Sequence, residues 1–148
     1  MLGKPFCEQE ALKKLTPGNL FDFENPVIPI KTGSRWYGSI SREVVRRGFA
    51  IPDVPLGGAR FVAPFLFVAL WSDDSRYTEK LLAACGASCL RVASQRAMPR
   101  LVLPVLGGKE GMSWLWAVEK GILEQADELD EADQVVPDHI YVTDKKLD

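Results

Sequence analysis

The stretch FVAPFLFVALW, residues 61–71, is the longest apolar run in the chain. It is far shorter than the about 20 apolar residues that a membrane-spanning helix requires. Apolar and polar residues do not alternate within it, which is typical of a strand covered on both of its faces. We therefore interpret the run as one buried strand of an α/β protein.

Predicted helices and strands alternate outward from this run in both directions. The elements that we expect are a helix over residues 8–15, a strand over 26–30, a helix over 38–48, the strand 61–71, a long helix capped within 73–75, a strand over 101–106, a helix capped by Ser113 and a strand over 139–143. The acidic segment 127–133 is interpreted as a solvated connection. This alternation predicts an α/β fold whose mostly parallel or mixed sheet carries helices on both faces.

The composition fits one globular domain that spans residues 1–148. Of the 148 residues, 47% are apolar and 26% are charged, both ordinary values for a globular protein. Lys4, Glu8 and Glu10 interrupt any apolar run at the N-terminus, so we expect no secretory signal. We therefore predict a cytoplasmic protein with no membrane partner.

The charge balance disfavours nucleic acid as a partner. The formal net charge is -2, so no global basic field attracts phosphates. Arg42, Arg46 and Arg47 form the one candidate basic patch, and the sequence leaves open whether they face a partner or only water.

The cysteines and the histidine give no sign of a metal or redox centre. Cys7, Cys85 and Cys89 do not make a disulfide framework, and the last two share one face of a predicted helix, where cysteine packs as a small apolar residue. His139 is the single histidine, which excludes metal sites that need several imidazoles. We expect no bound metal and no cofactor.

Two glycine-rich loops each connect a predicted strand to a predicted helix. They are KTGSRWYGS, residues 31–39, and GGKEG, residues 107–111. Glycine lets backbone N–H groups approach an anion, and a following helix N-terminus favours negative charge. In a parallel sheet both loops lie outside the carboxyl ends of the strands, where ligands bind. We therefore expect a nucleotide-like ligand, although neither loop matches a P-loop or a dinucleotide fingerprint.

A purely structural interpretation of both loops stays open. The glycines of residues 107–111 would then serve a tight turn, and Trp36 and Tyr37 of the first loop would pack into the core instead of covering a ring or a sugar. The ligand hypothesis requires the two loops to lie side by side with free amides between them. Indole and phenol rings that fill the space between the loops would oppose it.

The order of these motifs resembles a macro domain, and is most similar to the branch that includes the terminal ADP-ribose protein glycohydrolases. The residues that carry the resemblance are GNLF at 18–21, the first glycine loop, the buried strand with its long helix, and LPVLGG at 103–108. It extends over about residues 16–144. The resemblance implies a three-layer α/β fold that binds ADP-ribose or a related nucleotide in a crevice between the two loops.

By position, the resemblance also implies which residues contact this ligand. Asn19 and Leu20 would meet the adenine, which Thr143 would flank. The two loops would hold the diphosphate and distal ribose through Gly33, Tyr37, Gly38 and Ser39 of the first and Gly107, Gly108, Lys109, Glu110 and Gly111 of the second.

Several departures from the family pattern favour binding without catalysis. Asn19 replaces the usual aspartate, and residues 70–73, LWSD, lack the lysine that attacks the sugar in the glycohydrolase branch. Glu110 falls where that branch carries its acidic partner. Three alternatives stay open: a macro-type hydrolase with Lys31 or Lys109 as nucleophile and Glu110 as general acid/base, an enzyme acting on another nucleotide, and an interaction domain that has lost the pocket.

Overall fold

A computed structural model describes residues 18–107 and 111–143, so the helix expected at residues 8–15 lies outside the described part. The elements are η1 (Leu20–Asp22), β1 (Val27–Lys31), α2 (Gly38–Arg46), β2 (Ala59–Val62), β3 (Phe65–Trp71), α3 (Glu79–Gln95), β4 (Arg100–Leu103), α4 (Gly111–Glu131) and β5 (His139–Val142). The α/β class is confirmed. None of the described helices is long and apolar enough to cross a membrane.

The strands form two small sheets. β3 is the middle strand of the first sheet, in which it pairs in parallel with β1 and antiparallel with β2. β4 and β5 pair in parallel as a separate two-stranded sheet. β4 lies close to β1, but no ladder of hydrogen bonds joins the two strands.

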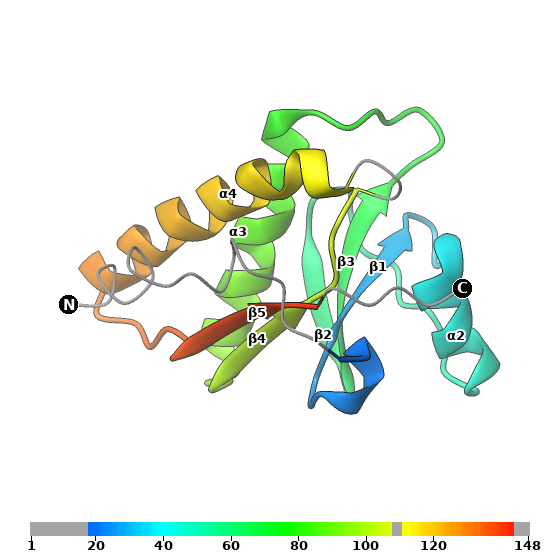
Figure 1. The fold of residues 1–148 in the computed structure, drawn as a ribbon, viewed down its shortest axis with the longest axis horizontal. Helices are drawn as coiled ribbons and strands as arrows, with labels where there is room; N and C mark the ends of the chain where they lie inside the picture. Colours follow the sequence, from blue (N-terminus) through cyan, green and yellow to red (C-terminus); the bar gives the residue numbers. More distant parts are fainter. Residues whose placement is uncertain (1–17, 108–110, 144–148) are drawn as a thin grey trace.

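Helices cover the strands on both sides (Figure 1). Val27 and Leu66 belong to the core that lies against α3 and α4, whereas Ile28 and Phe67 belong to the core against η1 and α2. Successive residues of a strand point to opposite faces, so a strand covered on both faces is apolar throughout. This two-sided burial explains why the apolar run does not alternate at β3.

The prediction of one strand over residues 61–71 is wrong, because the run folds back on itself. β2 ends at Val62, Ala63 and Pro64 make the turn, and β3 begins at Phe65. Proline has no backbone N–H to donate to a central ladder, so it stands at the turn. Burial alternates along β2, which is one of the two edge strands of its sheet.

Two predicted helix boundaries are also wrong. Thr78 caps α3, where its hydroxyl accepts a hydrogen bond from the Leu81 N–H at 3.1 Å, while Ser75 instead closes a turn onto Ser72. α4 begins at Gly111 rather than after a Ser113 cap, and it continues through most of the acidic segment to Glu131. Buried Ala126 and Leu129 extend the apolar face of α4 into that segment.

α3 and α4 approach each other until their backbones are in contact. A Cβ atom at Gly121 would overlap the Ala83 carbonyl of α3, and one at Gly86 would lie 2.5 Å from the Val118 carbonyl oxygen of α4. Cys85 and Cys89 are fully buried in the same core, as their spacing predicted. Burial raises the pKa of the Cys85 thiol to about 12.

Candidate functional site

The carboxyl ends of the parallel strands bring the loops of interest to one edge. Lys31 at the end of β1 stands opposite Trp71 at the end of β3, and the chain leaves both strands in the same direction. Figure 1 shows the tips of β1 and β3 next to the first turn of α4. The first glycine loop, the segment after β3 and the start of α4 therefore share this edge.

Four aromatic rings run along the edge, and we call them the ring row. The Tyr37 and Trp71 ring centroids are 4.1 Å apart, Trp71 and Tyr77 are 6.0 Å apart, and Tyr77 and Trp114 are 6.5 Å apart. Trp114 reaches Gly107, because a Cβ built on that glycine would lie 3.2 Å from Trp114 Cδ1. The ring row thus connects the first loop to the second and lies between them.

The amides of the first loop are largely engaged within the protein. The Thr32 N–H donates to the Trp71 carbonyl at 2.9 Å, the Gly33 N–H donates to the Asp53 carboxylate at 3.2 Å, and the Tyr37 N–H donates to the Ser41 hydroxyl at 2.7 Å. Asp53 thereby occupies the Gly33 amide with an anionic group of the protein itself. Gly33 is one of the two glycines of this loop, with Gly38, that were expected to meet a ligand.

Lys31 is held by a carboxylate. Its Nζ lies 2.9 Å from Asp73 Oδ1, and the Arg35 guanidinium contacts both oxygens of Asp73 at 3.2 and 3.3 Å. Hydrogen bonds from Lys31 and then from Arg35 lower the pKa of Asp73. A lysine nucleophile needs its amine free to attack, whereas the Lys31 amine is held by the Asp73 carboxylate. The geometry therefore opposes a catalytic role for Lys31.

Two buried polar atoms have no hydrogen-bond partner among residues 18–107 and 111–143, namely Trp114 Nε1 and Thr143 Oγ1. Thr143 is only 2% exposed, and its backbone N–H donates to the Leu103 carbonyl at 2.9 Å. That bond fixes Thr143 beside Leu103, the last residue of β4. Gly107 follows Leu103 by four residues in the chain. An unpaired buried polar group costs about 1–3 kcal/mol, so it calls for an explanation such as a ligand or water.

The other expected contact residues lie in different settings. The Asn19 side chain accepts a hydrogen bond from the Phe21 N–H at 2.9 Å and caps η1, and Leu20 is buried in the core. Gly38 and Ser39 form the first turn of α2. Gly111 opens α4, whereas Gly108, Lys109 and Glu110 lie outside the described residues.

Sequence reasoning missed Trp114 and Trp71. The indole of Trp114 stands in the first turn of a helix that follows a glycine loop, a position from which a side chain reaches back over the loop. Trp71 ends the long apolar run and was interpreted as part of the core. The ring row combines residues far apart in the chain, and no local spacing indicates it.

Within the described residues, no three His, Cys, Asp or Glu side chains gather into a group that could hold a metal ion. The chain matches no protein-family model, and no curated protein is significantly similar to it. The likeness to a macro domain therefore remains a hypothesis, supported by the motifs and their order.

Proposed function

We propose that the chain binds a small nucleotide-like ligand at the carboxyl edge of its strands, and that it does so without cleaving the ligand. ADP-ribose is the first candidate, because the motif order resembles a macro domain. The observation that supports the proposal is the pair of unpaired buried polar atoms, Trp114 Nε1 and Thr143 Oγ1. Buried polar groups are nearly always paired, and a ligand can supply the partners that the described residues do not.

The two atoms have complementary chemistry. The indole N–H of Trp114 is a donor only, whereas the Thr143 hydroxyl can donate and accept. A ligand with hydroxyl and carbonyl-like groups, such as a ribose or a base edge, satisfies both. This assignment places the polar contacts on the β4–α4 side of the edge and not on the first loop, whose Gly33 amide is engaged.

Gly107 supports the same side of the site. Its φ of +111° is a conformation that side-chain-bearing residues rarely adopt, and a Cβ there would lie 3.1 Å from Gly111 Cα. Glycine at this position therefore lets Gly111 and the Trp114 indole lie close against the backbone, which keeps Trp114 beside the second loop. Tyr37, which is 45% exposed and packs on Trp71, supplies a ring on which a base can stack.

The non-catalytic part of the proposal follows from Lys31. Its ammonium is paired with Asp73, and the loop before Asp73 has no second lysine, since residues 70–73 read LWSD. We expect no release of ADP-ribose from an ADP-ribosylated protein substrate. Release that disappears in the Lys31→Ala variant would overturn this part alone and support the hydrolase alternative.

Isothermal titration calorimetry of the full chain tests the binding proposal. The titrants are ADP-ribose, adenosine, ribose 5-phosphate and inorganic phosphate, each with wild type, Thr143→Val and Thr78→Val. Thr78→Val is the matched control, because it removes a hydroxyl that already has a partner in the α3 cap. We expect binding that Thr143→Val weakens and Thr78→Val leaves unchanged. Absence of heat and of thermal shift with every titrant would contradict the proposal.

An interaction domain is the second candidate function. The specific observations that favour it are the ring row between the two loops and the occupied Gly33 amide. Under this alternative the aromatic rings close the edge to ligands, and the chain contacts a partner through its outer surface.

A further inference from the structure

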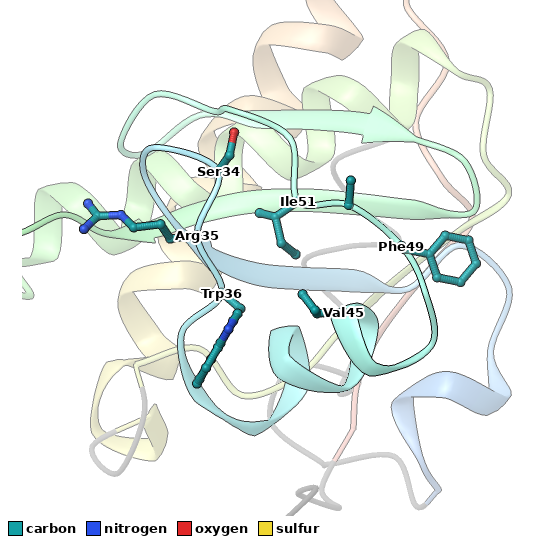
Figure 2. Close-up of a pocket in the computed structure, with 7 residues that line it drawn as sticks. Ser34, Arg35, Trp36, Val45, Phe49 and Ile51 are labelled. Atoms are coloured by element: carbon teal, nitrogen blue, oxygen red, sulfur yellow. The ribbon is translucent and has the colours of Figure 1, made fainter.

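An open hollow lies between α2, the loop that precedes it and the segment 49–51 that follows it. Its volume is about 460 Å³, and we call it the α2 hollow; it is lined by Ser34, Arg35, Trp36, Val45, Phe49, Ala50 and Ile51. Figure 2 shows Val45 and Ile51 pointing into the space between the first loop and α2, with Arg35 and Phe49 toward its two ends. The volume falls in the roughly 300–1,000 Å³ range of sites that bind small groups.

The floor and walls of the α2 hollow are apolar and accessible. Trp36 is 48% exposed, Val45 is 41% exposed and Phe49 is 40% exposed, while buried Ile51 forms part of the floor. Single exposed apolar residues are ordinary, but a contiguous group around one hollow marks an interaction site. The Phe49 ring is braced edge-on against Phe65 at 5.0 Å, so this wall is rigid.

The rim of the hollow is positively charged. Arg42 lies over the Trp36 ring at 5.9 Å and has no carboxylate partner among the described residues. Arg46 and Arg47 share one carboxylate, that of Glu43, and Lys31 and Arg35 share that of Asp73. Even with Asp53 beside Gly33, the cations outnumber the carboxylates around this surface. The net charge of the whole chain is nevertheless -2, so the positive charge is local.

We infer that the α2 hollow docks an acidic peptide segment of a partner protein, with one bulky apolar side chain inserted between Trp36 and Val45. The apolar lining takes the anchor side chain, and Arg42 pairs with a carboxylate next to it. Aromatic and arginine side chains dominate the energy of such interfaces, and both kinds meet here. The inference is separate from the proposed function, because Trp36, Arg42 and Val45 belong neither to the ring row nor to the residues with unpaired polar atoms, Trp114 and Thr143.

A nucleic acid fits this surface less well. Its phosphates need a track of free cations, but Glu43 and Asp73 stand among the arginines and would repel a polyanion. The Arg42 guanidinium lies over the Trp36 ring and the Phe49 ring is in edge contact with Phe65, so both lining rings already have a cation or ring partner. A peptide carboxylate needs one cation and can approach Arg42 alone.

Fluorescence anisotropy of a dye-labelled peptide tests the inference. The probe carries one tryptophan flanked on both sides by glutamates, and two further probes replace the tryptophan with alanine or the glutamates with lysines. We expect the acidic tryptophan probe alone to bind, with an affinity that falls as salt rises. Binding of labelled oligothymidine in place of the peptide would overturn the inference in favour of a nucleic-acid surface.

Single substitutions test whether the acidic probe binds at the α2 hollow. Trp36→Ala and Arg42→Glu should each raise the Kd of the acidic probe about tenfold or more. Trp116→Ala and Arg60→Glu are the matched controls, since both residues are exposed and lie outside the hollow, and they should leave the Kd unchanged. Thermal unfolding checks that each variant folds. Should Trp36→Ala not fold, the exposed Arg42→Glu variant still decides the result.

Equal Kd values for wild type, Trp36→Ala and Arg42→Glu would overturn the inference, as would failure of the acidic tryptophan probe to bind. Titration of the same variants with ADP-ribose keeps the two proposals apart. Because Arg42 does not touch the ring row, Arg42→Glu should lose the peptide and retain any nucleotide-like ligand.

Discussion

The Thr143 N–H donates to the Leu103 carbonyl at 2.9 Å, yet the hydroxyl of the same Thr143 has no partner among the described residues. The backbone bond extends the β4–β5 ladder by one residue, and it fixes a polar side chain in a buried place. The backbone of Thr143 thus serves the fold, whereas its hydroxyl makes no bond to the part of the chain that the structure describes.

Removing the unpaired hydroxyl should not weaken the free protein. Valine has the shape of threonine without a group that needs a partner, so we expect Thr143→Val to raise the free energy of unfolding by up to about 1 kcal/mol, or to leave it unchanged. Thr78→Val, which removes the α3 cap, should lower it by about 1 kcal/mol. Urea unfolding of both variants measures these differences. A loss at Thr143 as large as that at Thr78 would mean that the hydroxyl is paired.

The Ser41 hydroxyl should stabilise the first loop. It accepts a hydrogen bond from the Tyr37 N–H at 2.7 Å and donates to the Tyr37 carbonyl at 2.9 Å, and the residue is fully buried. Ser41→Ala removes both bonds, so we expect a loss of about 1–2 kcal/mol in the free energy of unfolding. Ser39→Ala, on the same helix but without a side-chain bond in the structure, should change little. Equal values for the two variants would contradict the proposed anchoring of Tyr37.

The close contact between α3 and α4 should decide whether Gly121→Ala raises or lowers the free energy of unfolding. Helix propensity alone would make Gly121→Ala stabilising by about 1 kcal/mol. The added methyl group would overlap the Ala83 carbonyl, and overpacking of this kind costs about 1–3 kcal/mol, so we expect a net loss. Glu128→Ala at an exposed position of α4 is the control and should be nearly neutral. A Gly121→Ala variant more stable than wild type would show that the helices lie farther apart.

Glu43 should titrate far below a free glutamate. Hydrogen bonds from Arg46 and then from Arg47 lower its pKa from 4.5 to about 2. A carboxyl whose pKa is depressed by folding adds stability above its unfolded pKa and loses it as pH falls through the folded value. The contribution is therefore complete above pH 4.5 and lost towards pH 2. NMR titration of the Glu43 side chain checks the midpoint, and the Glu43→Gln variant should lack the corresponding loss of stability. A midpoint near 4.5 would contradict these hydrogen bonds.

The buried thiols should be unreactive until the chain unfolds. Burial raises the pKa values of Cys85 and Cys89 and denies access to reagents. In a Cys7→Ser background, we expect Ellman's reagent to label neither thiol of the native protein at pH 8 and both in denaturant. Labelling of the native protein would show that the core opens.

The sequence allowed the class of the fold to be predicted because the physical signals are local. Two-sided burial was expected for the whole run 61–71 and is observed for its β3 part, whereas the spacing of Cys85 and Cys89 indicated a buried helical face, as observed. The turn that divides the run consists only of Ala63 and Pro64. Because neither residue is polar, the sequence did not show that the run forms two strands. The extent of α4 was missed because exposed acidic residues conceal the apolar face formed by Ala126 and Leu129.

The candidate site was harder to predict because its contacts are not local. Asp53 reaches the Gly33 amide across twenty residues of chain, so the loop that looked free is closed by a distant segment. The ring row likewise needs the fold to bring Tyr37 and Trp114 to one edge. Thr143 was expected through the resemblance, whereas the missing partner of its hydroxyl became visible only in three dimensions.

The absence of a hydrogen-bond ladder between β1 and β4 divides the protein along a seam. Tyr37 and Trp71 lie on one side of the seam, and Trp114 and Thr143 lie on the other. Side chains of one core cluster and helix α3 pack on both sides of the seam, and no backbone ladder between β1 and β4 holds the two sides at a fixed distance. Under the proposed function, a ligand bound at this edge would lie against residues from both sides of the seam.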